Sequence, residues 1–152
     1  MSFKCVLVGD EFSGKSSFVA KLRGCFDPSK KYSPTIGVEV IPLDLNTSHG
    51  KITLNIWDCA GDSRYCGLRD VYYIGAHCAI IFSAEKNNLT FWQNDVFQVC
   101  QNIPMELVKN KIDILGSDSS LTNISIKTNI NCMDPIRNIL VKITGDKNIV
   151  IY

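Results

Sequence analysis

The stretch Gly9-Asp10-Glu11-Phe12-Ser13-Gly14-Lys15-Ser16 decides the fold, because it matches the pattern G-x-x-x-x-G-K-[ST]. In this pattern the loop's backbone N–H groups turn inward around phosphate oxygens, and the following helix adds the positive end of its dipole. Residues 3–8 form an apolar run that predicts a buried strand, and residues 15–22 predict a helix. The match therefore stands between a strand and a helix, as a phosphate-binding loop requires.

Strands and helices alternate along most of the remaining chain. We predict strands over residues 38–45, 51–57, 78–82, 105–108 and, weakly, 123–125, and helices over residues 67–75, 89–102 and 134–143. Residues 26–34 are polar, contain two prolines and predict a loop. The first two of these strands predict a hairpin with a five-residue connection. The pattern indicates an α/β fold: a mostly parallel six-stranded sheet with one antiparallel edge strand and helices on both faces.

The composition excludes several classes of protein. The 152 residues fit one domain, 1–152, and 45% hydrophobic with 20% charged residues excludes a disordered chain. A net charge of +1 offers no general electrostatic footprint for nucleic acid or an anionic membrane. We see no bilayer-spanning run, no signal peptide and no prenylation cysteine. We therefore expect a soluble, intracellular monomer without a membrane anchor, whose seven cysteines are free thiols.

Three further segments extend the phosphate loop into a nucleotide site. Lys15 is expected to reach the β- and γ-phosphates, and the Ser16 hydroxyl to coordinate Mg²⁺. Asp58, at the end of a predicted strand, would hold Mg²⁺ directly or through water, while the Gly61 N–H would meet the γ-phosphate. Thr35 would place its hydroxyl on Mg²⁺ and its N–H on the γ-phosphate. Two loops ordered by one terminal phosphate make a two-state switch.

The segment Asn110-Lys111-Ile112-Asp113 predicts which base is bound. It follows a strand, where ligands bind in open α/β sheets. The Asp113 carboxylate can accept two N–H groups from the N1/N2 edge of guanine, whereas adenine would leave it unpaired. This favours GTP and GDP, and it argues against the alternative of an ATPase or a small-molecule kinase.

With these motifs in order, the chain resembles the Ras superfamily of small GTPases, most closely its nuclear-transport branch, Ran. The resemblance covers nearly the whole chain, and its most specific stretches are residues 30–32, 35–43, 67–70, 72–74, 78–81 and 99–104. It implies that Ser125, Ile126 and Lys127 contact guanine and that Phe26 packs on the guanine edge. The expected nucleotide contacts are Asp10, Glu11, Phe12, Ser13, Gly14, Lys15, Ser16, Ser17, Phe26, Thr35, Gly61, Asn110, Lys111, Asp113, Ser125, Ile126 and Lys127. The implied partners are importin-β-type transport receptors, a Ran-type activating protein and an exchange factor, in the nucleus and the cytoplasm.

The chain departs from this family at the residues that support hydrolysis. Asp62 stands where the family has a glutamine that orients the attacking water, and Glu11 and Phe12 replace small glycines of the loop. The expected catalytic residues are Asp62, Thr35 and Lys15, and of these Asp62 departs from the family's glutamine. We hypothesise a GTPase with impaired catalysis. The alternative is a hydrolysis-deficient mimic that stays loaded with GTP and competes for transport receptors.

The chain is also short for this family. Between Asp113 and Ser125 there are few residues, where the family fits a helix and much of a strand. We therefore expect the sheet to persist while its edge near the guanine site is less covered, which predicts weaker nucleotide retention.

Overall fold

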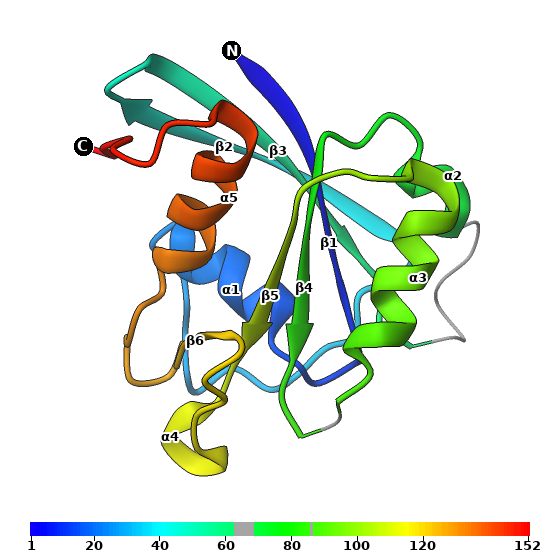
Figure 1. Cartoon of the computed structure of the whole chain (residues 1–152). Helices are drawn as coiled ribbons and strands as arrows, with labels where there is room; N and C mark the ends of the chain where they lie inside the picture. Colours follow the sequence, from blue (N-terminus) through cyan, green and yellow to red (C-terminus); the bar gives the residue numbers. More distant parts are fainter. Residues whose placement is uncertain (63–68, 86) are drawn as a thin grey trace.

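The computed structural model describes residues 1–62, 69–85 and 87–152. A six-stranded sheet in the order β2-β3-β1-β4-β5-β6 forms the centre of the molecule (Figure 1). The elements are β1 (Ser2–Gly9), α1 (Lys15–Leu22), β2 (Val38–Thr47), β3 (Gly50–Cys59), α2 (Arg69–Tyr73), β4 (Cys78–Ser83), α3 (Leu89–Cys100), β5 (Met105–Lys109), α4 (Ile112–Leu115), β6 (Thr122–Asn123) and α5 (Asp134–Thr144).

The predicted fold class is confirmed. The described ladders between neighbouring strands are parallel except for β2–β3, which is antiparallel and lies at one edge of the sheet. Helices α1 and α5 cover one face of the sheet, and α2 and α3 cover the other (Figure 1). The predicted helix over residues 67–75 begins outside the described residues, and its described part is α2, Arg69–Tyr73.

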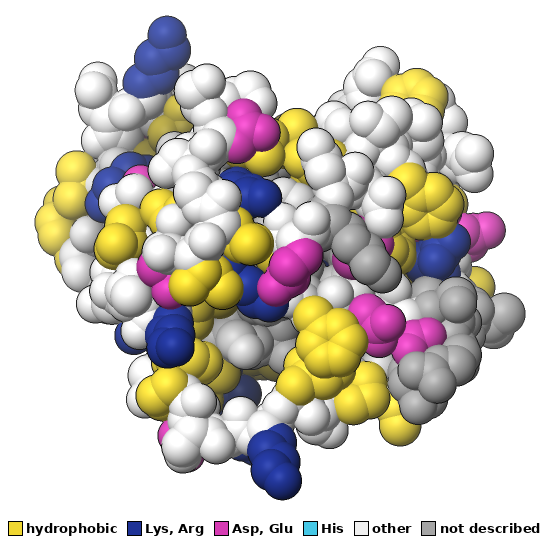
Figure 2. Space-filling model, turned by 90° about the horizontal axis from the view of Figure 1, so that it is seen from below, with side chains coloured by type: hydrophobic (Ala, Val, Ile, Leu, Met, Phe, Trp, Pro, Cys, Tyr) yellow, Lys and Arg dark blue, Asp and Glu magenta, His cyan; other side chains and the backbone are white. Residues whose placement is uncertain are grey.

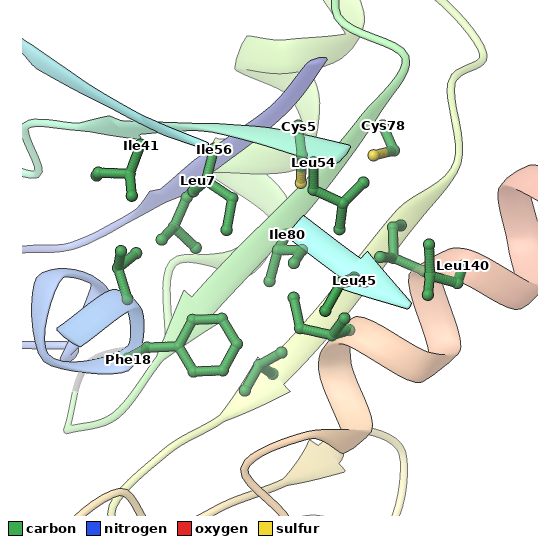
Figure 3. Close-up of a cluster of buried hydrophobic side chains, with 14 of the residues drawn as sticks. Cys5, Leu7, Phe18, Ile41, Leu45, Leu54, Ile56, Cys78, Ile80 and Leu140 are labelled. Atoms are coloured by element: carbon green, nitrogen blue, oxygen red, sulfur yellow. The ribbon is translucent and has the colours of Figure 1, made fainter. Parts of the chain in front are cut away.

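Alternation along the central strands builds one core on each face. Cys5 and Leu7 of β1 point toward α1 and α5, while Val6 and Val8 point toward α2 and α3. The first of these cores gathers side chains from β1 to β4, α1 and α5, including Phe18 (Figure 3). Both faces of β1 are buried, which explains why its sequence is a continuous apolar run.

The five-residue hairpin connection predicted between β2 and β3 is wrong. Pairing continues to Thr47 and Gly50, so the turn contains only Ser48 and His49. The Thr47 hydroxyl accepts from the His49 N–H at 3.1 Å and donates to the Gly50 carbonyl at 2.8 Å. The end of the chain also pairs with this hairpin, since the Tyr152 N–H donates to the Asn46 carbonyl. These contacts extend the ladder through polar residues that look like a loop in the sequence.

The shortened region between Asp113 and Ser125 folds as one helical turn and a minimal strand. Helix α4, Ile112–Leu115, was not predicted, and β6 pairs with β5 through Thr122 and Asn123 only. Glu106 of β5, which is 4% exposed, links the β6 edge to α5. Its carboxylate accepts from Thr122, from Asn138 at 2.9 Å and from Lys142 at 2.7 Å. Within the described part of the chain, no helix is long and apolar enough to cross a membrane.

Candidate nucleotide-binding site

The loop between β1 and α1 closes around the Lys15 side chain. Lys15 Nζ donates to the carbonyl oxygens of Gly9 at 2.8 Å and of Asp10 at 2.9 Å. The Ser13 hydroxyl donates to the same Asp10 carbonyl at 2.6 Å. Lys15 is only 7% exposed, so its ammonium group is held at the floor of the loop. This is the placement that a phosphate-binding lysine needs.

Ser16, Thr35 and Asp58 meet at one point, although they come from α1, the loop of residues 25–37 and β3. Ser16 Oγ donates to Asp58 Oδ2 at 2.6 Å and lies 2.8 Å from Thr35 Oγ1. Because a hydroxyl carries one hydrogen, Thr35 is then the donor toward Ser16. The structure thus brings together the three residues that the sequence predicted as metal ligands.

Asp58 is a buried carboxylate with spare acceptor capacity. It is 1% exposed, and among the described residues its Oδ1 atom is buried and accepts no hydrogen bond. Burial raises the pKa of Asp58, and the Glu39 charge raises it further, while Ser16 and Lys15 act in the opposite direction. A carboxylate and two hydroxyls are hard oxygen ligands of the kind Mg²⁺ takes, and the orphan oxygen offers it a partner. The three residues therefore fit Mg²⁺.

A pocket of about 710 Å³ lies beside this point, at the end of the sheet where β1 and β3 finish. Seen from that side, the surface is hollowed, with basic and acidic side chains near one another (Figure 2). The predicted residues that line it are Phe12, Gly14, Lys15, Ser16, Ser17, Phe26, Thr35, Asp58, Gly61 and Lys111. Phe26 is half-buried, and Lys21 Nζ lies 5.6 Å from its ring centroid. The pocket thus joins the phosphate loop to the loop of residues 25–37.

The predicted base-recognition residues are joined to the phosphate loop through Asn110. Asn110 is 3% exposed, and its Nδ2 donates to the Ser13 carbonyl at 3.0 Å. Its Oδ1 accepts from the Ile126 N–H at 3.4 Å. Gly14 has a φ of 95°, and a Cβ there would lie 2.2 Å from Asn110 Nδ2, so this contact requires glycine. The side chain of Ile126 is buried in the core below the loop.

Asp113 is exposed and oriented by Ser125. Ser125 Oγ donates to Asp113 Oδ1 at 2.8 Å, and the Thr128 N–H and hydroxyl point to Ser125 Oγ at 3.2 and 2.7 Å. Ser125 is fully buried, so this hydroxyl is fixed. Lys127 is exposed. The arrangement leaves the Asp113 carboxylate with spare acceptor capacity.

Lys111 lies between the phosphate loop and the predicted base-recognition residues. It adopts a left-handed backbone with φ 59°, and its Nζ lies 3.0 and 3.3 Å from the two Glu85 carboxylate oxygens. This ion pair closes a second pocket of about 240 Å³, which Asp10, Glu11 and Ser13 also line. The Glu85 partner was not foreseen from the sequence, because Glu85 lies 26 residues away in a turn without a motif.

The mouth of the phosphate loop is covered by two aromatic rings. Phe12 has a φ of 61° and stacks on Tyr32, with ring centroids 4.1 Å apart. Burial raises the pKa of Tyr32; the carboxylates Glu11, Asp62 and Asp58 raise it further, against a lowering contact with the Phe12 backbone. Asp62 itself is buried, at 8% exposure. The mouth is therefore both aromatic and acidic.

Gly61 connects this mouth to the strand that carries Asp58. A Cβ on Gly61 would lie 2.5 Å from the Glu11 nitrogen and 2.6 Å from the Gly9 carbonyl oxygen, so the two backbones touch. The next residue back, Ala60, donates its N–H to the Gly37 carbonyl at 2.9 Å. The phosphate loop, the segment after β3 and the loop that carries Thr35 are thus in direct contact.

The family model described as Ras of Complex, Roc, domain of DAPkinase matches residues 4–113, more than two thirds of the chain. The chain belongs to this family of Ras-like GTPase domains. The match begins in β1 and ends at Asp113, so it includes the phosphate loop, Thr35, Asp58 and the whole Asn110–Asp113 segment. Ras-like GTPases bind GTP or GDP with Mg²⁺. Family membership and site geometry therefore both indicate a nucleotide-binding switch.

Three features of the site were missed in the sequence. The stacking of Phe12 on Tyr32 joins two loops, and the Lys111–Glu85 pair joins two others. The third is a set of hydrogen bonds from Asn88 and Trp92 to the Asp10 carboxylate. Trp92 lies on the buried face of α3, within the predicted helix, but its indole N–H adds a polar contact that periodicity does not show.

Proposed function

We propose that this chain is a guanine-nucleotide switch that binds GTP with Mg²⁺, hydrolyses it slowly and presents its two loops to protein partners. The observation that carries the proposal is the meeting of Ser16, Thr35 and Asp58 beside Lys15, with Asp58 Oδ1 left over as an acceptor. Bound Mg²⁺ would neutralise charge on the β- and γ-phosphates. Because Thr35 belongs to a loop and Ser16 to a helix, loss of the ion would release that loop.

Guanine selectivity is supported by the fixed carboxylate at Asp113. Ser125 orients this carboxylate from a buried position, and Asn110 ties the same region to the phosphate loop. A base without two adjacent N–H groups would leave the carboxylate unpaired. We therefore propose GTP and GDP as the ligands.

Slow hydrolysis is supported by the residues at the phosphate mouth. Asp62 is shorter than glutamine and anionic, so it is poorly suited to hold a water beside a charged phosphate. Glu11 adds a second negative charge, and the Phe12–Tyr32 stack occupies the approach that an arginine from an activating protein would use. Removing an arginine's contribution costs about 10³ to 10⁵ in rate.

The sequence resemblance supports a Ran-like role in transport between nucleus and cytoplasm. The segments concerned are those around Thr35 and residues 67–74, together with residues 99–104. Importin-β-type receptors, a Ran-type activating protein and an exchange factor are the proposed partners. The covered mouth favours a second candidate, a GTP-locked mimic that occupies such receptors without cycling.

Single-turnover GTP hydrolysis tests the proposal and separates the two candidates. The wild type, Asp62→Gln, Glu11→Gly and the double variant are loaded with GTP, and phosphate release is followed with and without a Ran-type activating protein. We expect slow release from the wild type and faster release from the double variant. Normal stimulated hydrolysis by the wild type would contradict the proposal. A zero basal rate with GTP-dependent receptor binding would favour the mimic.

A further inference from the structure

Asp10 makes two sets of contacts that lie on opposite sides of the phosphate loop. Its backbone carbonyl accepts from Lys15 Nζ at 2.9 Å and from the Ser13 hydroxyl at 2.6 Å, both inside the loop. Its carboxylate points away from the loop. Both carboxylate oxygens lie 3.2 Å from Asn88 Nδ2, and Oδ1 also accepts from Trp92 Nε1 at 3.3 Å. One residue therefore supplies an acceptor for the phosphate-binding lysine and is itself held by the start of α3.

The Trp92 ring is in turn held by α2. Arg69, the first residue of α2, places its guanidinium carbon 5.2 Å from the Trp92 ring centroid and 5.6 Å from that of Phe91. Arg69 Nε lies 2.7 Å from Asp95 Oδ2, and its Nη2 donates to Oδ1 at 3.2 Å. The buried Tyr73 hydroxyl donates to the same carboxylate at 2.8 Å. Both ends of α2 thus contact α3 through Asp95, and the two helices lie side by side in Figure 1.

We propose that Asn88 and Trp92 are positioning residues for the phosphate loop, and that the Asp10 carboxylate couples this loop to the α2–α3 pair. Trp92 is 3% exposed, and hydrogen bonds to an ionised carboxylate are stronger than those to a neutral acceptor. The Asp10 carboxylate therefore fixes the loop against Trp92 and the Arg69 stacked on it. This inference rests on the proposed function, because it requires GTP in the pocket.

Release of a fluorescent GTP analogue tests the hydrogen-bonded link. Trp92→Phe keeps an aromatic ring but removes the N–H donor, and we expect release about 2- to 30-fold faster than in the wild type. Trp57→Phe is the matched control, since Trp57 lies on β3 with Lys4 Nζ 3.6 Å from its ring centroid and makes no contact with Asp10. In an Asp10→Asn background, the effect of Trp92→Phe should shrink, because the carboxylate partner is already altered.

The outcomes separate this inference from the proposed function. Failure of the wild type to bind GTP with Mg²⁺ would remove the proposed function and the inference together. Normal binding by the wild type with unchanged release from Trp92→Phe would overturn the inference alone. A Trp92→Phe effect that simply adds to that of Asp10→Asn would also overturn it, because independent structural damage is additive.

Fluorescence of Trp92 gives a second, spectroscopic test. In the Trp57→Phe variant, Trp92 is the only tryptophan left, since the chain has two. We expect its emission to differ between the GTP-loaded and nucleotide-free forms, and this difference to be lost in Asp10→Asn. Identical emission in the two forms would contradict the coupling.

Discussion

The Phe12 ring lies on the Tyr32 ring, with centroids 4.1 Å apart and planes inclined by 34°. This contact connects the phosphate loop to the loop that carries Thr35. Phe12 adopts a left-handed backbone for it, with φ 61°, which a bulky L-residue adopts only at a cost. The stack therefore offsets local strain and joins the two loops at the edge of the pocket.

Replacing Phe12 by glycine should open the mouth of the phosphate loop. Because an aromatic pair contributes about 0.5–1.5 kcal/mol, we expect nucleotide release about 2- to 12-fold faster, measured with a fluorescent GTP analogue. The melting temperature should not fall, since glycine tolerates the positive φ. Tyr32→Phe keeps both rings and serves as the control with near-normal release. Equal release rates for Phe12→Gly and the wild type would show that the stack does not close the site.

Replacing Asp58 by asparagine should separate stability from metal binding. The raised pKa of Asp58 means that burial disfavours its ionised form, so at neutral pH the charge costs stability in the nucleotide-free protein. We expect Asp58→Asn to raise the free energy of unfolding of that form by about 1 kcal/mol, measured in urea. The same change should abolish the Mg²⁺ dependence of GTP binding. A less stable variant that keeps its Mg²⁺ dependence would contradict our assignment of the metal site.

Replacing Ser125 by alanine should weaken guanine recognition without touching the phosphates. The lost hydrogen bond to Asp113 Oδ1 leaves the carboxylate less well oriented. A typical hydrogen bond contributes about 0.5–1.5 kcal/mol, so we expect GTP affinity to fall about 2- to 12-fold while the weak binding of ATP stays the same. Titration calorimetry with both nucleotides measures this. An equal loss for ATP would show a general disruption of the pocket instead.

Replacing Lys142 should destabilise the shortened edge of the sheet. Lys142 balances the charge of buried Glu106, so Lys142→Met leaves that carboxylate with two neutral donors, Thr122 and Asn138. We expect a loss of about 1–3 kcal/mol in unfolding free energy. The double variant Glu106→Leu with Lys142→Met removes both charges and should recover much of this loss. A double variant less stable than Lys142→Met would contradict the charge-pair explanation.

Patterns among residues that are close in the sequence predicted most of the helices and strands, because neighbouring residues decide where these elements form. Helix α1 has the predicted bounds, and the predicted strands differ from those observed by at most two residues at either end. The phosphate loop and the Asn110–Asp113 segment were predicted because their chemistry depends on neighbouring residues. By contrast, Asp10 and Trp92 lie 82 residues apart, and no periodicity links them. Helix α4 was missed because a single turn carries too few residues for a helical pattern.

The nucleotide carried by the purified protein tests the central claim most directly. Protein prepared with Mg²⁺ present is denatured, and the released nucleotide is identified and quantified by chromatography. A guanine-nucleotide switch with slow hydrolysis should release mainly GTP, although weak retention can leave the amount below one per chain. Mainly GDP would contradict slow hydrolysis, and an adenine nucleotide would contradict the proposed guanine recognition by Asp113 and Ser125.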